Sequence, residues 1–272
     1  MVLTSGFLDS LPAWFGTNEA DNDTLSSEQA LTSTTVLAFQ GDDTMNGSEN
    51  ADVIFGGQGN DELLGQAGND TLLGNKDTDF LDGNTGNDLL FGGSGTDLIV
   101  GGEGDDIITG DLDVDIYKGG EGADTFVFRV DQAGETQEVD TIISLIPGIP
   151  DEVELPDAVI TDFDPNSDRI ALTEGLTQED LTFETFNSEE TFGVDFDFVL
   201  PIILDAVPDG LEFLEKGDIS IEDIDPDGDG VVTGTAIRIA ASNELLGYIL
   251  NVEPEVLESL GSDRFVSTDG LF

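Results

Sequence analysis

From Gly56 to Val127 the sequence reads GGQGNDELL, GQAGNDTLL, GNKDTDFLD, GNTGNDLLF, GGSGTDLIV, GGEGDDIIT, GDLDVDIYK and GGEGADTFV. The repeat length is nine, and the same phase extends back through GSENADVIF and AFQGDDTMN to Ala38. These ten nonapeptides share an acidic sixth position, which is occupied by Asp43, Asp52, Asp61, Asp70, Asp79, Asp88, Asp97, Asp106, Asp115 and Asp124. The eighth position is always apolar, from Met45 to Phe126. Two fixed columns over this length indicate a repeat architecture.

Each nonapeptide divides into a turn and a strand. Positions one to six are rich in Gly, Asn and Asp, which tolerate tight bends. Positions seven to nine are short and mostly apolar, as in a strand, and alternation places position eight on one face with seven and nine on the other. One short strand cannot bury a core, but stacked strands can. The pattern therefore predicts an all-β solenoid of two parallel sheets, with two nonapeptides per coil and about five coils.

The acidic column creates an electrostatic problem. Equivalent turns on one side of the stack lie about 4.8 Å apart, and unit charges at that distance repel by roughly 3 kcal/mol at an effective dielectric near 20. Lys76 and Lys118 are the only basic residues in the repeats, so an external cation is needed. Ca²⁺ suits carboxylates and the carbonyls of Gly-rich turns better than Mg²⁺. The chain has no Cys or His, which argues against zinc and copper.

The pattern GGxGxDxUx resembles the RTX, or hemolysin-type, calcium-binding repeat. The resemblance implies a right-handed parallel β-roll with calcium held between turns two nonapeptides apart, about eight ions in all. Asp61 would then share an ion with the turn of Asp79, and Asp70 with the turn of Asp88. The implied ligand positions are the ten Asp residues above together with Gly56, Gly57, Gly59, Gly65, Gly68, Gly74, Gly83, Gly86, Gly92, Gly93, Gly95, Gly101, Gly102, Gly104, Gly119, Gly120 and Gly122.

The repeats depart from this pattern at several places. Asp77 and Asp113 stand at position four, Asp111 stands at position two, and the nonapeptide from Ala38 lacks both leading glycines. The alternative is an acidic solenoid whose Asp side chains are solvated, which leaves the repulsion uncompensated.

Composition limits the possible functions. The 272 residues include 60 acidic and 7 basic residues, a net charge of −53, so nucleic acid and anionic membranes are repelled as partners. The absence of His and Cys excludes Ser-His-Asp and Cys-His catalysis, whereas a two-carboxylate glycosidase stays compatible. We expect no enzyme, because the catalytic domains that accompany RTX rolls are usually larger than the rest of this chain and the His-dependent ones cannot operate without His. The apolar runs are too short for a transmembrane helix, and the amino terminus lacks the basic region of a secretory signal.

Four regions are predicted along the chain. Residues 1–37 form a leader that either caps the roll or is a solvated tail, with a strand at Thr34–Phe39. Residues 38–127 form the roll, residues 128–158 an acidic linker with a strand at Val139–Leu145, and residues 159–272 a β-rich carboxyl-terminal domain.

The segment VITDFDPNSDRIAL, residues 159–172, reads as two strands about a turn and resembles the segment that follows RTX repeats. Further predictions are strands at Asp197–Leu204 and Ile219–Glu222, a hairpin of Thr235–Ala241 with Leu245–Val252, and a helix at Glu253–Leu260.

Two features of the carboxyl-terminal domain allow alternative interpretations. Asp225, Asp227 and Asp229 match the first ligand positions of an EF-hand loop and could hold one further Ca²⁺, but the twelfth position is Ala236, so a solvated acidic turn is the alternative. The end of the chain, with Asp269 and Phe272, is similar to the segments that direct type I secretion, and a frayed end is the alternative.

One outer face of the predicted roll carries no charge. Positions seven and nine of alternate nonapeptides are Val53, Phe55, Thr71, Leu73, Leu89, Phe91, Ile107, Thr109, Thr125 and Val127. On so acidic a protein, this face should be covered by the carboxyl-terminal region or by another subunit.

These features lead to one preferred function. We expect a secreted or cell-surface calcium-binding protein with a structural or adhesive role, exported by type I secretion machinery and folding on calcium outside the cell. The alternative is a polysaccharide-acting enzyme or glycan-binding module that uses the roll as a secretion carrier.

Overall fold

The fold is taken from a computed structural model, which describes residues 4–8, 11–24, 35–129, 156–192, 214, 216–226, 228–229, 231–268 and 271. The chain divides into two compact units, Met1–Phe126 and Val127–Phe272. Each unit is described by itself below. The predicted strands at Val139–Leu145 and Asp197–Leu204 lie outside the described residues.

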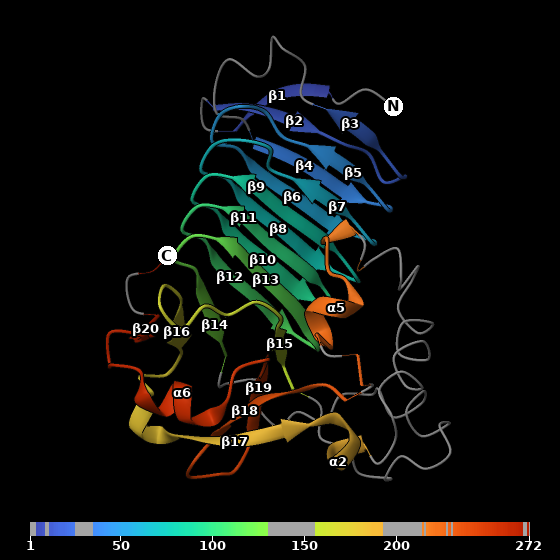
Figure 1. Ribbon diagram of the computed structural model, residues 1–272. Coiled ribbons are helices and arrows are strands. Elements are labelled where there is room, and N and C mark those ends of the chain that lie inside the picture. Colours follow the sequence, from blue (N-terminus) through green and yellow to red (C-terminus); the bar gives the residue numbers. More distant parts are fainter. Residues whose placement is uncertain are drawn as a thin grey trace. The chain divides into compact units, whose positions relative to one another are not determined.

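The first unit is a β-roll of two parallel sheets (Figure 1). The first sheet contains β2 (Leu11–Phe15), β4 (Thr35–Gln40), β6 (Val53–Gln58), β8 (Thr71–Lys76), β10 (Leu89–Ser94), β12 (Ile107–Leu112) and the start of β14 (Thr125–Phe128). The second contains β3 (Asn22–Thr24), β5 (Thr44–Asn46), β7 (Glu62–Leu64), β9 (Phe80–Thr85), β11 (Leu98–Glu103) and β13 (Asp115–Glu121). Neighbours within each sheet are parallel. The predicted solenoid of paired nonapeptides is confirmed.

The core follows the eighth position of the repeat. Its ten side chains, from Met45 to Phe126, are at most 2% exposed. Most strands of the roll run on past position nine into the next turn, as β6 does from Val53 to Gln58. The first position is also buried in these strands, as at Gly56 and Gly74, so each coil presents a large and a small residue to the interior. The turn is therefore shorter than the sequence predicts.

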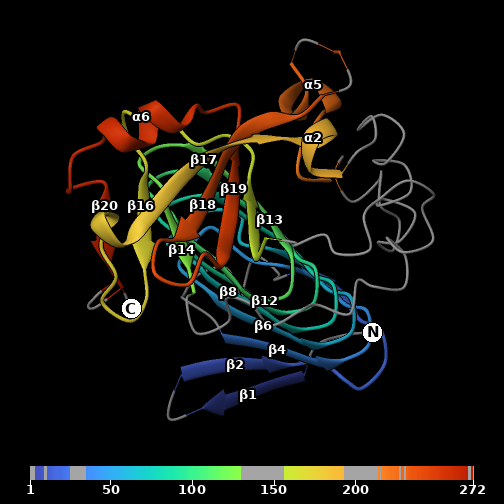
Figure 2. The same cartoon turned by 90° about the horizontal axis from the view of Figure 1, so that it is seen from below.

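The roll has one coil that the nine-residue period does not reveal. β2 and β3 pair in parallel with β4 and β5, so that Ala13 lies beside Thr35 and Asn22 beside Thr44. β1 (Thr4–Leu8) pairs antiparallel with β2 and covers its free edge (Figure 2). The offset of 22 residues, in place of 18, hides this coil from the periodicity. The predicted strand at Thr34–Phe39 is confirmed by β4.

The second unit is a mixed structure built on a strand hairpin. β17 (Leu181–Asn187), β18 (Thr233–Ile239) and β19 (Leu245–Leu250) are antiparallel, and β15 (Ala158–Ile160) runs parallel to β19. β16 (Arg169–Leu172) pairs with β20 (Phe265–Ser267). The helices are η3 (Gln178–Asp180), α2 (Ser188–Phe192), α5 (Ile221–Ile224) and α6 (Pro254–Ser259).

Most sequence predictions for the second unit hold. The two strands about the turn at 159–172, the hairpin around Asn243 and the helix at Glu253–Leu260 are confirmed. The strand predicted at Ile219–Glu222 is wrong, because helix α5 begins there at Ile221. Ser220 lies just before this helix, and its hydroxyl and backbone N–H both bond Asp223, an arrangement that favours a helix start over a strand.

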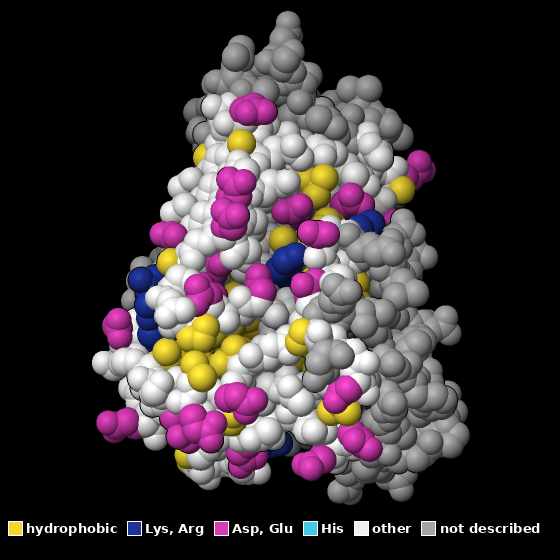
Figure 3. Space-filling model, viewed as in Figure 1, with side chains coloured by type: hydrophobic (Ala, Val, Ile, Leu, Met, Phe, Trp, Pro, Cys, Tyr) yellow, Lys and Arg dark blue, Asp and Glu magenta, His cyan; other side chains and the backbone are white. Residues whose placement is uncertain are grey.

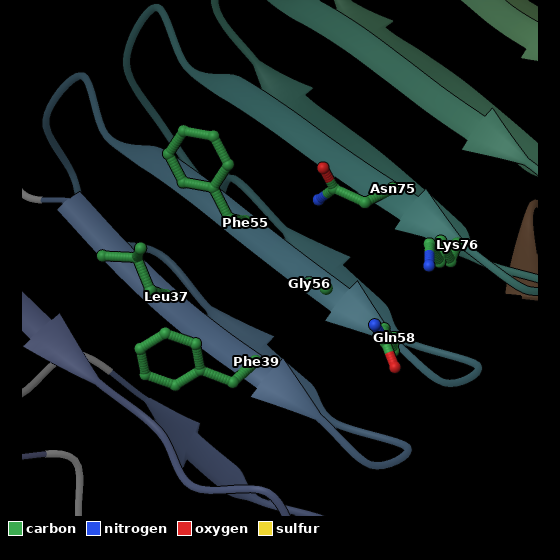
Figure 4. Close-up of a pocket in the computed structure, with 8 residues that line it drawn as sticks. Leu37, Phe39, Phe55, Gly56, Gln58, Asn75 and Lys76 are labelled. Carbon is green, nitrogen blue, oxygen red and sulfur yellow. The ribbon is translucent and has the colours of Figure 1, made fainter.

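The uncharged outer face of the first sheet is partly exposed. Phe55, Leu73 and Phe91 are each half-buried, and what covers this face stays a prediction. A shallow groove of about 310 Å³ opens near its amino-terminal end. Figure 4 shows Phe39 on β4 and Asn75 on β8, separated by the strand that carries Gly56. Gly57 has no side chain between its neighbours Phe39 and Asn75, and the groove forms there.

Candidate metal centre

Two rows of buried carboxylates line the turns of the roll. The ten Asp residues at position six are at most 3% exposed, although each carries a formal charge. Five belong to turns that lead into each sheet, and successive members of a row are 18 residues apart. The alternative of a solenoid with solvated Asp side chains is therefore wrong, because buried carboxylates need compensation.

One oxygen of most of these carboxylates connects neighbouring turns. The backbone N–H of one Asp donates to Oδ1 of the Asp one coil further on, in eight bonds of 2.7–3.0 Å from Asp43→Asp61 to Asp106→Asp124. These bonds stitch the coils together and offset part of the charge repulsion. In eight of the ten carboxylates, the protein alone satisfies one oxygen in this way.

The second oxygen is left without a partner in most turns. Among the described residues, buried Oδ2 atoms that accept no hydrogen bond include those of Asp43, Asp61, Asp70, Asp79, Asp88, Asp97 and Asp106. A buried, charged oxygen without a donor is costly. A row of such atoms indicates a cation that completes the site.

Glycine at position one makes room beside this second oxygen. A Cβ added to Gly65 would lie 2.5 Å from Oδ2 of Asp70 and 2.8 Å from the carbonyl oxygen of Gly83 in the next turn. Gly74, Gly83 and Gly101 have the same surroundings. Each turn thus brings a carboxylate oxygen and a carbonyl oxygen of its neighbour to one small space, and the lack of a side chain keeps this space open.

Burial raises the pKa of these carboxyl groups. Burial raises the pKa of Asp61 to about 7, of Asp70 to about 8 and of Asp79 to about 9. The backbone hydrogen bond to each carboxylate lowers its pKa, and the neighbouring carboxylates raise it further. The pKa of Asp97 lies well above its usual range for the same reason. A bound divalent cation would remove this penalty by favouring the ionised form.

The donor set fits calcium. No three His, Cys, Asp or Glu side chains converge on one point within the described ranges, and the buried carboxylate of each turn is the one at position six. Hard oxygen ligands from a flexible turn suit Ca²⁺. Of the predicted ligands, the structure places the glycines at position one beside the orphan oxygens. Gly57, Gly59 and their equivalents at positions two and four supply the left-handed backbone of the turn.

Two of the predicted Asp ligands differ from the others. Ser48 donates both its backbone N–H and its hydroxyl to Oδ2 of Asp52. Asp115 lies in the turn where Tyr117 enters from the core, and Gly110 donates its N–H to the Tyr117 hydroxyl at 2.6 Å. Neither Asp appears in the row of orphan oxygens.

A second ladder, which the sequence analysis missed, runs along position five. The side-chain oxygens of Asp42, Asn60, Asn69, Asn87 and Asp105 accept a hydrogen bond from the backbone of the following coil, at 2.9–3.2 Å. Its direction is opposite to that of the position-six bonds. The frequent Asn and Asp residues at position five were the sequence signal that could have predicted this ladder.

The acidic loop with Asp225 and Asp229 stays a predicted calcium site. Asp225 is buried and accepts the Gly228 N–H, whereas Asp229 is exposed and accepts the Val231 N–H. Asp227 lies outside the described residues.

Acidic side chains are also scattered over the visible surface, with few basic ones among them (Figure 3).

The fold and its turns define the class of protein, which is a parallel β-roll whose turns are suited to hold metal ions. Residues 37–126, one third of the chain, match the family model described as RTX calcium-binding nonapeptide repeat (4 copies), in stretches 37–72, 55–90, 64–99, 73–106 and 91–126. This part of the chain is therefore an array of RTX calcium-binding repeats. The comparison with curated proteins gave no match. Among the helices that the structure describes, none is long and apolar enough to cross a membrane.

Proposed function

We propose that this protein is a secreted, non-enzymatic calcium-binding protein with a structural or adhesive role, whose roll folds when calcium enters its turns. The observation that carries the proposal is the row of buried Oδ2 atoms without hydrogen-bond partners, from Asp43 to Asp106. About eight ions follow from one ion in each gap between stacked turns.

Folding and calcium binding are coupled in this proposal. Without the cation, buried carboxylates repel one another and each keeps an unsatisfied oxygen, so the roll is unstable. Millimolar calcium outside a cell stabilises the folded form through mass action, because the unfolded chain lacks the assembled site. A chain unfolded in calcium-poor cytosol suits export through the narrow channel of a type I secretion system.

The test is circular dichroism of the full chain, recorded while calcium is titrated into chelated protein. We expect the strand signal to rise cooperatively with calcium and magnesium to have a much weaker effect. A complete strand signal in excess chelator, unchanged by calcium, would refute the proposal.

A second candidate function is polysaccharide binding, favoured by the groove on the first sheet. Phe39 is 42% exposed and its ring stacks on Phe15, with centroids 6.3 Å apart. Gln58, Asn75 and Lys76 add polar groups to the same groove. Aromatic and amide side chains are suited to sugar rings. Binding of a polysaccharide that Phe39→Ala abolishes, at unchanged calcium content, would support this candidate.

A further inference from the structure

The turns of this protein fall into two kinds by backbone conformation. In nine of the ten nonapeptides, positions two and four both have positive φ, between 67° and 148°. Glycine occupies many of these positions, but Phe39, Gln66, Asn75 and Asp111 adopt the same conformation. We call these open turns. They include every turn whose Asp has an orphan Oδ2.

The turn from Gly47 to Asp52 is different. Neither Ser48 nor Asn50 has positive φ. The Ser48 N–H donates to Oδ2 of Asp52 at 2.8 Å, and the Asn50 N–H donates to the Ser48 hydroxyl at 3.2 Å. The second oxygen of the carboxylate is therefore satisfied from inside its own turn, and we call this a closed turn.

The same network recurs in the coil that the periodicity did not reveal. The Thr17 N–H donates to Oδ2 of Asp21 at 2.7 Å, and the Glu19 N–H donates to the Thr17 hydroxyl at 3.2 Å. Asp21 is buried and its own N–H donates to Oδ1 of Asp43. It thus begins the row that continues with Asp43 and Asp61, just as Asp52 is the first Asp of the other row.

A third closed turn lies in the second unit, at Phe163–Asp168. The Asp164 N–H donates to Oδ2 of the buried Asp168 at 2.8 Å, and the Asn166 N–H donates to Oδ1 of Asp164 at 2.9 Å. Here a cation is built in: the Arg264 guanidinium donates to the carbonyl oxygens of Asn166, Ser167 and Asp168. A closed turn can therefore satisfy its oxygens with the protein's own groups.

We infer that position two decides whether a turn takes up calcium, and that the closed turns bind none. The inference rests on the proposed calcium binding of the open turns. In the roll, a hydroxyl group stands at position two of both closed turns, Thr17 and Ser48, and neither residue has positive φ. The backbone N–H and the hydroxyl of this residue both donate to the second oxygen of the Asp. No unsatisfied oxygen is then left to attract an ion. Thr17 and Ser48 end the two calcium rows at their amino-terminal side.

The test compares matched substitutions in the full chain. Asp52→Asn changes a closed turn and Asp88→Asn an open turn of the same row. Calcium bound per chain at saturation is measured by equilibrium dialysis with elemental analysis, and circular dichroism reports folding. We expect Asp52→Asn to bind as many ions as the unaltered chain, and Asp88→Asn to lose at least one. A loss in Asp52→Asn equal to that in Asp88→Asn would overturn the inference.

A gain-of-site variant keeps the test decisive if Asp88→Asn does not fold. Ser48→Gly combined with Asn50→Gly frees position two and position four of the closed turn. We expect this chain to bind one more calcium ion, and an unchanged count would contradict the inference. An unaltered chain that binds no calcium at all would instead remove the proposed function, so the two failures are distinguishable.

Discussion

At the residue scale, the candidate calcium site depends on the missing side chain of the glycine at position one as much as on the carboxylate at position six. The carboxylate at position six is useful because position one has no side chain to fill the space beside it. Gly65 shows this relation to Asp70 and Gly83. The Asp column was visible in the sequence. The different roles of the two oxygens are visible only in the three-dimensional structure. Oδ1 accepts a hydrogen bond from the neighbouring turn, and Oδ2 is left for a cation.

Gly65→Ala tests this relation. The added Cβ would meet Oδ2 of Asp70 at 2.5 Å and the Gly83 carbonyl oxygen at 2.8 Å, so the turn has to shift. We expect a loss of about 1–3 kcal/mol in the free energy of unfolding in calcium, together with weaker calcium affinity, measured by urea titration and calorimetry.

Gly261→Ala is the control for this substitution. Its Cβ would meet only Oδ1 of Asp263, the end of an exposed side chain that can move aside. Equal effects of the two substitutions would show that the space beside Asp70 has no special role.

At the scale of the element, the sequence predicted regular repeats well and irregular ones poorly. The period of nine gave the strands of the roll and their inward residues, because backbone alternation follows directly from it. The coil at 11–24 was missed since its offset is 22 residues and Thr17 replaces glycine. The closed turn at Phe163–Asp168 was expected only as a turn, because its partner Arg264 is distant in sequence.

Arg264→Gln tests whether that turn depends on a built-in cation. The substitution removes charged donors from three carbonyl oxygens. A hydrogen bond to a charged group contributes about 1.5–3 kcal/mol to the free energy of unfolding. We expect the free energy of unfolding of the second unit to fall by about 2 kcal/mol, seen by hydrogen exchange around Asn166. Arg238→Gln is the control, since Arg238 pairs with a Glu184 carboxylate that is 57% exposed; the same loss there would contradict the special role of Arg264.

At the scale of the whole molecule, charge dominates the behaviour of the chain. The net charge of −53 exceeds what the metal sites can neutralise, so the surface stays strongly acidic (Figure 3). Composition alone indicated this. It could not separate the buried carboxylates, which titrate unusually, from those at the surface, because burial is a property of the fold.

The pH dependence of the metal-free protein should reflect the buried carboxylates. Their folded pKa values, about 7 for Asp61 and Asp106 and about 9 for Asp79, exceed that of an unfolded Asp. The folded state therefore binds more protons, and its stability is present at low pH and is lost as pH rises through these values. In chelator we expect more folded roll at pH 5 than at pH 9, by circular dichroism in 0.5 M NaCl, which screens surface charges.

Calcium should reverse this dependence, because it binds the ionised carboxylates and acid displaces it. The roll would then be most stable near pH 8 and lose calcium toward pH 5. The same profile with and without calcium would show that the titrating groups are not the metal ligands.

Anomalous X-ray diffraction from crystals grown in calcium tests the central claim most directly. The account predicts anomalous peaks in the turns, each beside an Oδ2 atom of the row that includes Asp61, Asp70, Asp79, Asp88, Asp97 and Asp106. Turns that hold only water in a calcium-saturated crystal would contradict it.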